Sequence, residues 1–222
     1  MIKAVLFDLD GTLVNSITDL TNSTNYAISV CGAGPHSEEA YKYFVGNGIT
    51  IMIRRALGEK YTEENLKICR ERFFEHYNIH YADNTRVYAG MPQLVNKLNG
   101  RGIKTAVVTN KAEPAAKEVV NRLYGNVFNL VFGQREGIPT KPDPTLTLLA
   151  MEELGVKPEE CIFIGDSGMD VATGVNSGAV PVGVLWGFRK SEELLEHGAK
   201  YLISKPEELF DIILKVNNEA DI

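Results

Sequence analysis

Two carboxylates one residue apart close the first apolar run of this chain. The run AVLF at residues 4–7 is followed by Asp8 and Asp10. Alternate side chains of an extended segment point to the same side, so both acids are expected in one small volume at the end of a strand. Two negative charges held so close repel, and partial burial strengthens the repulsion. A bound cation, a shared proton or a reaction would each compensate that cost.

Further polar residues stand where other apolar runs end. The run at residues 103–109 closes with Thr109 and continues into Asn110 and Lys111. The run at residues 161–164 leads to Asp166 and Asp170, and Lys141 stands in TKPDP. Any one such residue is more often a turn former or a helix cap than a catalyst. Their joint occurrence at the ends of apolar runs favours a site.

A divalent cation would reconcile the acids. Asp8, Asp166 and Asp170 offer the hard oxygen ligands suited to Mg²⁺, which commonly combines one or two carboxylates with substrate phosphate oxygens. A set without His or Cys argues against zinc. The groups expected to hold the remaining phosphate oxygens are Lys141, Thr109 and the backbone amides of the turn at Gly11 and Thr12.

Short apolar runs alternate with helical stretches from about residue 103 onward. This alternation predicts an α/β protein with a parallel sheet covered by helices on both faces. Ligands of such sheets bind at the carboxyl ends of the strands, where the polar residues above converge. The expected strands are 2–9, 103–109, 128–132, 161–164, 179–185 and 201–203, with helices beginning near Glu113, Thr145, Met169, Glu192 and Pro206.

A helical module is expected between the first strand and this alternating region. Residues 16–81 show no convincing strand, whereas ITIMIRRAL at 49–57 and ENLKICRERFFEHY at 64–77 carry helical periodicity. We therefore expect a core of residues 1–15 and 82–222 with the module inserted at 16–81. Its Gly46-Asn47-Gly48 precedes a helix, so free backbone amides there could hold an anion, although a tight turn explains the glycines equally well.

Composition excludes several function classes. The chain of 222 residues has a formal charge of −6 and no basic block, which argues against a general nucleic-acid binder. No stretch approaches the ~20 apolar residues of a membrane span, and the opening MIKAVLFDLD is no signal peptide. Three cysteines without a CxxC pair favour reduced thiols. We expect a soluble, cytoplasmic monomer or homodimer.

Four segments together resemble the haloacid dehalogenase-like superfamily. They are DLDGT at 8–12, VVTN at 107–110, Lys141 in KPDP, and GDSGMD at 165–170, in the order of that family's motifs. The resemblance extends along the whole chain. It implies a Rossmann-like α/β core and identifies the inserted module as a helical cap.

The resemblance also implies a role for each motif residue. Asp8 would be the nucleophile that forms an aspartyl phosphate, and Asp10 the general acid and then the general base. Mg²⁺ would be bound by the carboxylates of Asp8 and Asp166 and by the backbone carbonyl of Asp10. Asp170 would support the metal directly or through water. The residues expected to orient the phosphoryl oxygens and the nucleophile are Thr109, Asn110 and Lys141.

Segments at 44–57, 88–98, 108–114 and 198–209 are similar to phosphoglycolate phosphatases. This resemblance implies phosphoglycolate as substrate, a small phosphorylated metabolite whose carboxylate would lie at Gly46-Asn47-Gly48, within reach of Arg54 or Arg55. One alternative is a sugar phosphomutase of the same superfamily, although those enzymes tend to carry Val where this chain has Thr12. Another, from a different class, is a phospho-accepting receiver-type signalling module. That module places its acidic pair and its acceptor on different strands and has no inserted cap.

Overall fold

Parallel strands form the centre of the protein, which we describe from a computed structural model for residues 1–219. Within that range six strands build one sheet in the order β5-β4-β1-β6-β7-β8, and every neighbouring pair is parallel. The predicted α/β sheet is therefore confirmed. The strands are β1 (Ala4–Phe7), β4 (Lys104–Ala112), β5 (Leu130–Gln134), β6 (Cys161–Gly165), β7 (Val180–Val184) and β8 (Tyr201–Ile203).

The strand β1 lies in the middle of the sheet because its side chains are apolar on both faces. Val5 and Phe7 belong to the apolar cluster on one face, whereas Ala4 and Leu6 belong to the cluster on the other. In register, Leu6 lies between Ala106 of β4 and Phe163 of β6. The carboxyl ends of β1, β4 and β6 are consequently neighbours, and that edge is where ligands of open α/β sheets bind.

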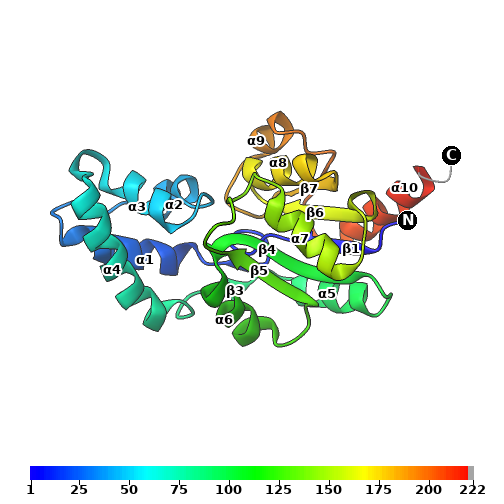
Figure 1. Cartoon of the computed structure of the whole chain (residues 1–222), viewed down its shortest axis with the longest axis horizontal. Helices are drawn as coiled ribbons and strands as arrows, with labels where there is room; N and C mark the ends of the chain where they lie inside the picture. The colour runs from blue at the N-terminus through cyan, green and yellow to red at the C-terminus, as the bar shows by residue number, and fades with distance from the viewer. Residues whose placement is uncertain (220–222) are drawn as a thin grey trace.

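Helices cover both faces of the sheet (Figure 1). The face of Ala4 and Leu6 packs against α7, and the face of Val5 and Phe7 packs against α5 and α6. No helix within residues 1–219 is long and apolar enough to span a membrane. The core helices are α5 (Met91–Asn99), α6 (Glu113–Tyr124), α7 (Thr145–Leu154), α8 (Gly168–Ser177), α9 (Ser191–Glu196) and α10 (Leu209–Glu219), with 3₁₀ turns at Pro158–Glu160 and Pro206–Glu208.

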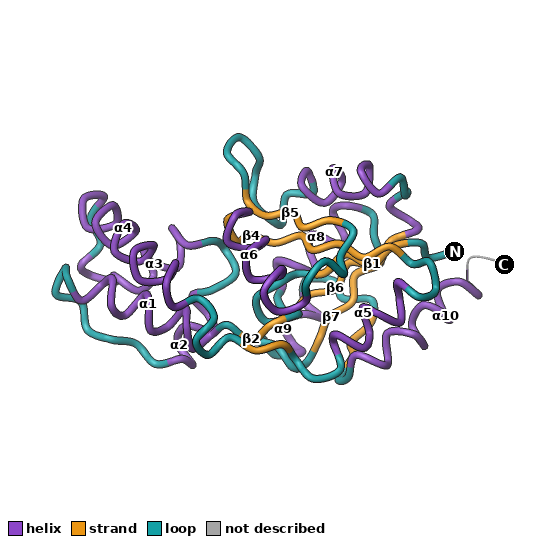
Figure 2. Tube along the Cα trace, turned by 90° about the horizontal axis from the view of Figure 1, so that it is seen from below, coloured by secondary structure: helices purple, strands orange, loops and turns teal. Residues whose placement is uncertain are grey.

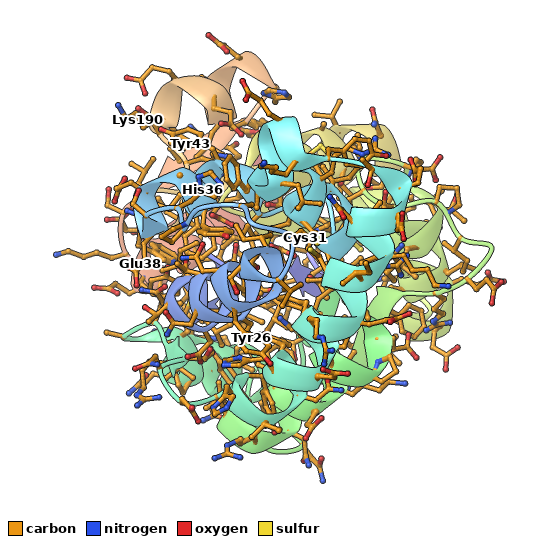
Figure 3. All side chains as sticks on the ribbon, turned by 90° about the vertical axis from the view of Figure 1, so that its left-hand side faces the viewer. Tyr26, Cys31, His36, Glu38, Tyr43 and Lys190 are labelled. Atoms are coloured by element: carbon orange, nitrogen blue, oxygen red, sulfur yellow. The ribbon has the colours of Figure 1, made fainter. Side chains whose placement is uncertain are left out.

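A bundle of helices stands beside the sheet, on the left in Figure 1. It consists of α1 (Ile17–Ser29), α2 (Glu38–Phe44), α3 (Ile49–Leu57) and α4 (Glu63–His80), with a 3₁₀ turn at Gly58–Lys60. Figure 3 views the molecule from this end, and Tyr43 of α2 lies on the side where the core loop carrying Lys190 approaches. The free thiols of Cys31 and Cys69 meet inside the bundle, with their sulfur atoms 3.5 Å apart. The two segments with helical periodicity form α3 and α4.

A short antiparallel pair joins the bundle to the core, near the β2 label in the tube view (Figure 2). The strand β2 (Val14–Asn15) pairs with β3 (Arg86–Val87), so the two chain crossings lie side by side. The buried carboxylate of Asp19 on α1 accepts hydrogen bonds from the backbone N–H groups of Asn84 and Thr85. We propose the division suggested by the sequence, with a cap at 16–81 and a core at 1–15 and 82–222.

Candidate active site

The predicted polar residues converge at the carboxyl edge of the sheet. Asp8 directly follows β1, Asp166 directly follows β6, and Thr109 lies in the last part of β4; all three are buried. One local expectation differs: β1 ends at Phe7, so Asp10 lies in a turn rather than in an extended strand. Asp8 and Asp10 nevertheless line the same cavity, because the turn folds back over the end of the strand.

The amides of that turn are engaged within it. The N–H of Gly11 donates to the carbonyl of Val14 at 2.8 Å, and the N–H of Thr12 donates to the carbonyl of Leu9 at 3.3 Å. This differs from the expectation that the two amides are free for phosphate oxygens. The hydroxyl of Thr12 instead donates to Asp166 at 3.3 Å, which ties the turn to the acid after β6.

Lys141 joins two of the acids. Its ammonium donates to Asp8 at 2.7 Å, to Asp170 at 2.6 Å and to the carbonyl of Val108 at 3.2 Å. Each of the three N–H donors of the ammonium can therefore have its own acceptor, and the lysine side chain is 2% exposed. Burial alone would lower the pKa of Lys141, but Asp170 and Asp8 raise it, so the group stays cationic.

Carboxylate oxygens of Asp8, Asp166 and Asp170 lie within 4.8 Å of one another. One oxygen of Asp170 accepts from Lys141, and the other accepts from the N–H and the hydroxyl of Ser167. Asp166 accepts from the N–H of Phe188 at 2.7 Å as well as from Thr12. Asp170 thus accepts protein hydrogen bonds at both oxygens, whereas Asp8, which lines the cavity, accepts from Lys141 at one oxygen.

Two glycines make room for Asp166. A Cβ added at Gly11 would lie 2.3 Å from an oxygen of Asp166, and a Cβ at Gly187 would lie 2.1 Å from its Cβ. Real carbon atoms do not approach so closely. Gly11 also has φ +94°, which disfavours other residues. The glycine of DGT is therefore required by the position of the acid.

The acid cluster fits a divalent cation. Burial, and secondly the charge of Asp170, raise the pKa of Asp8 to about 6 against the opposing effect of Lys141. Burial and the charges of Asp170 and Asp8 likewise raise the pKa of Asp166. The three buried acids have Lys141 as a cation bonded to two of them, so the cluster lacks positive charge. All of the atoms that the acids could offer to a metal are oxygens. Mg²⁺ prefers such ligands and would restore the ionised form of the acids.

Asp10 is held by groups from outside its turn. One oxygen accepts from the hydroxyl of Ser16 at 2.6 Å, and the ammonium of Lys111 lies 3.2 and 3.3 Å from the two oxygens. The same ammonium donates to the hydroxyl of Tyr77 on α4 at 2.7 Å. The sequence placed Lys111 at this edge of the sheet without assigning it a role, and Tyr77 was not predicted as a site residue. The only sequence signal was the lysine directly after VVTN.

The loop between α2 and α3 closes the site from the cap side. Asn110 donates to the carbonyl of Gly46 at 2.8 Å and accepts from the N–H of Lys141 at 2.8 Å. Arg189 donates to the carbonyl of Val45 at 2.9 Å. Asn110, predicted to contact the phosphoryl group, therefore links the cap loop to the lysine loop. Gly46 and Gly48 line the cavity; Asn47 is not among its lining residues.

The cavity beside Asp8 and Asp10 is small. Its volume is ≈ 40 Å³, and its cap side is apolar. The cap residues that line it are Leu20, Val45, Gly46, Gly48, Ile49 and Met52, facing Thr109, Asn110 and Lys111 of the core.

The two arginines of α3 point elsewhere. Arg54 donates to the hydroxyl of Tyr61 at 3.0 Å, and Arg55 donates to the carbonyls of Tyr43 and Phe44 at 3.0 Å. This differs from the expectation that one of them reaches the substrate. Arg189, which was not predicted, lines a smaller cavity that adjoins the same acids.

Comparison with known proteins identifies the family of this chain. Residues 5–184 match the family described as haloacid dehalogenase-like hydrolase. This chain belongs to that family. The predicted membership is thus confirmed, and it excludes the receiver-type signalling module.

Individual relatives narrow the kind of hydrolase. A phosphoglycolate phosphatase of Chromobacterium violaceum is 34% identical over 218 residues, covering 96% of each chain. The N-acetylmuramic acid 6-phosphate phosphatase of Pseudomonas aeruginosa is 31% identical over 214 residues, covering 96% of this chain and 95% of that one. A candidate phosphoglycolate phosphatase from Lactobacillus delbrueckii superposes with a TM-score of 0.90 at 31% identity, covering 95% and 98%. The chain described here is therefore a phosphatase, and it resembles phosphoglycolate phosphatases.

Proposed function

We propose that this phosphatase is Mg²⁺-dependent and hydrolyses small phosphate monoesters, phosphoglycolate first among them, through an aspartyl phosphate on Asp8. The observation that carries the proposal is the pair of acids at one cavity, each with its own buried lysine. Lys141 holds Asp8, and Lys111 holds Asp10. We place this activity in the cytoplasm, in a monomer or a homodimer.

The first half of the reaction uses the free oxygen of Asp8. That oxygen forms a bond to phosphorus while the bond from phosphorus to the leaving oxygen breaks. The electron pair of the broken bond stays on the leaving oxygen, which takes a proton from Asp10. Lys141 fixes the other oxygen of Asp8, and the hydroxyl of Thr109, at the end of the neighbouring strand, is the group we assign to a phosphoryl oxygen.

The second half regenerates the enzyme. A water molecule attacks phosphorus and gives its proton to Asp10, while the bond between phosphorus and Asp8 breaks. Inorganic phosphate leaves, Asp8 recovers its carboxylate, and Asp10 recovers the proton that it donated. Asp10 therefore serves as acid in one step and as base in the next.

We assign the metal to Asp8, Asp166 and the backbone carbonyl of Asp10. When bound there, Mg²⁺ supplies positive charge to the carboxylates and polarises the phosphoryl oxygens. Both oxygens of Asp170 and both oxygens of Asp166 accept protein hydrogen bonds, but only Asp170 is in addition neutralised by the ammonium of Lys141. We therefore assign Asp170 a contact through water and the task of holding Lys141.

The size of the cavity supports a small substrate. A volume of ≈ 40 Å³ holds about three water molecules, and the apolar cap residues that line it favour a leaving group of a few atoms. Several relatives at 27–34% identity are phosphoglycolate phosphatases. We assign the substrate carboxylate to the loop Gly46-Asn47-Gly48, opposite Asp8.

Release of inorganic phosphate tests the proposal. Phosphoglycolate, N-acetylmuramic acid 6-phosphate, glucose 1-phosphate and p-nitrophenyl phosphate should be compared with Mg²⁺ and with EDTA. We expect phosphoglycolate to give the highest kcat/KM and EDTA to remove activity on every ester. Higher kcat/KM on the amino sugar ester would refute the substrate assignment. Interconversion of glucose phosphates with little phosphate release would show a phosphomutase, and full activity in EDTA would refute the metal assignment.

Replacing Gly48 by proline should impair phosphoglycolate more than p-nitrophenyl phosphate. Gly48 has φ +82°, which proline cannot adopt, and proline removes an N–H. Losing one hydrogen bond to a charged group costs ~1.5–3 kcal/mol, so kcat/KM for phosphoglycolate should fall roughly 10–150-fold further than that for the aryl ester. Gly58→Pro, at the other end of α3 with φ +50°, is the matched control. Equal losses on both esters would assign the loop to cap closure alone.

A further inference from the structure

Lys111 is a buried cation that pairs with Asp10 but takes part in none of the reaction steps above. Its side chain is 3% exposed, and it follows Thr109 and Asn110 near the end of β4. Burying an ammonium is costly unless it is paired and hydrogen-bonded. The partners here are the carboxylate of Asp10, at 3.2 and 3.3 Å, and the hydroxyl of Tyr77, at 2.7 Å. One partner belongs to the proton-transfer group and the other to the cap.

We infer that Lys111 is a positioning residue for Asp10 and that Tyr77 supplies the cap's part of that positioning. The inference rests on the proposed function, since it presupposes proton transfer by Asp10. Asp10 lies in a turn beyond the strand, and its carboxylate is 13% exposed. Without Lys111, the hydroxyl of Ser16 would hold one oxygen only, and the carboxylate could rotate about that contact.

Rotation matters because proton transfer needs close contact. A general acid must lie within ~2.6–3.2 Å of the atom that it protonates, and the same holds for the general base and its water. Lys111 contacts both oxygens of Asp10 at nearly equal distances, and together with the Ser16 hydroxyl on one of them it fixes the orientation of the carboxylate. Both roles of Asp10 therefore depend on a side chain that itself touches neither reacting atom.

Tyr77 connects that arrangement to the cap. It lies in the last turn of α4, it is 3% exposed, and its ring stacks on Phe73 with centroids 5.0 Å apart. The ammonium of Lys111 also lies 4.8 Å from the centre of the Tyr77 ring. A tyrosine so firmly packed in the cap gives Lys111 a fixed acceptor only while cap and core are docked. The position of Asp10 is thereby tied to the docking of the cap.

The first test is the transient kinetics of Lys111→Met, which keeps the length of the side chain and removes its charge. With Mg²⁺ and p-nitrophenyl phosphate, the first turnover should stay within roughly threefold of wild type, because p-nitrophenolate leaves without protonation. The steady state should slow by roughly 10–100-fold, part of the full effect of acid–base catalysis, so a burst close to one p-nitrophenol per site should appear. A merely structural loss would lower the burst amplitude and both rates together, and that result would overturn the inference.

The second test is a double-mutant cycle with Asp10→Asn. If Lys111 acts through Asp10, adding Lys111→Met to Asp10→Asn should change the steady-state rate by less than about twofold. Losses that multiply fully would overturn the inference. Lys111→Arg should recover part of the steady-state rate, and Tyr77→Phe should show the same pattern as Lys111→Met with a smaller loss. These two variants decide the question if Lys111→Met does not fold.

Matched controls and a second ester complete the design. Lys117→Met removes an exposed lysine of α6, and Tyr81→Phe removes a cap hydroxyl that bonds Glu118 of the core; both should behave as wild type. An effect of Lys111→Met confined to KM for phosphoglycolate, with ethyl phosphate unaffected, would make Lys111 a substrate contact and overturn the inference. If wild type does not hydrolyse phosphoglycolate but Lys111→Met still shows the burst with p-nitrophenyl phosphate, only the substrate proposal is refuted.

Discussion

Asp8→Asn should abolish turnover while the fold stays intact. The amide keeps the shape of the carboxylate, but it is a far poorer nucleophile and a weaker ligand for Mg²⁺. We expect steady-state phosphate release to fall below about 1% of wild type, a loss of at least ~2.7 kcal/mol of transition-state stabilisation. The exposed Asp211 of α10 offers a control for the same chemical change, and Asp211→Asn should be fully active. Substantial turnover by Asp8→Asn would remove Asp8 from the nucleophile role.

In the absence of metal, Asp8→Asn should raise the free energy of unfolding, and the size of this increase should depend on pH. Burial raises the pKa of Asp8 from 3.8 to about 6, so the folded state binds a proton that the unfolded state releases between these values. The free energy of unfolding of the wild type therefore rises as the pH falls through about 6 and Asp8 takes up its proton. Above about pH 6 the buried charge of Asp8 remains and this contribution is missing. A shift of this size corresponds to about 3 kcal/mol at most.

Chemical unfolding in EDTA measures this effect. The free energy of unfolding of Asp8→Asn should exceed that of wild type at pH 7.5, and the difference should shrink toward pH 5. Saturating Mg²⁺ should favour wild type, because the carboxylate then has its cation. A difference independent of pH would mean that the buried charge of Asp8 is not what destabilises the metal-free protein.

The sheet could be predicted because its central strands, such as β1 and β6, are buried on both faces. Such strands are nearly continuous apolar runs, and each predicted run overlaps an observed strand. β4 extends to Ala112, beyond the predicted end at 109, because Ala112 pairs with Gln134 of β5 after an irregularity in the register. The two-residue strands β2 and β3 were not predicted, since they exist only through their mutual pairing and leave no periodicity in the sequence.

Acids at strand ends were identifiable for the same reason: the topology of a parallel sheet brings them together. Partners contributed by distant segments were not. Tyr77 reaches Lys111 from 34 residues away, and the linker residue Thr85 reaches Asp19 from 66 residues away. Asn110 lines the cavity, but no local pattern shows that its amide donates to the carbonyl of Gly46. The sequence identifies which side chains lie at the carboxyl edge of the sheet, whereas tertiary packing determines what each of them contacts.

Asp10→Asn should separate the two steps of the reaction. General acid–base help is worth on the order of 10²–10⁴-fold, but the two steps need it unequally. A p-nitrophenolate leaving group departs readily without a proton, whereas the hydrolytic water still requires a base. Formation of the phosphoenzyme from p-nitrophenyl phosphate should therefore suffer less than its breakdown, and phosphate should accumulate on Asp8.

Rapid mixing and mass spectrometry would show this directly. A burst of p-nitrophenol close to one per active site should precede a steady state slowed by roughly 10²-fold or more. The trapped phosphate should lie on Asp8 and disappear in the double variant with Asp8→Asn. With phosphoglycolate, whose alkoxide leaving group needs protonation, the burst should be absent and the first turnover itself should be slow. Steady turnover near wild type, with neither burst nor phosphoaspartate, would show that Asp10 is neither the acid nor the base, and the proton path would then have to begin at another group of the cavity.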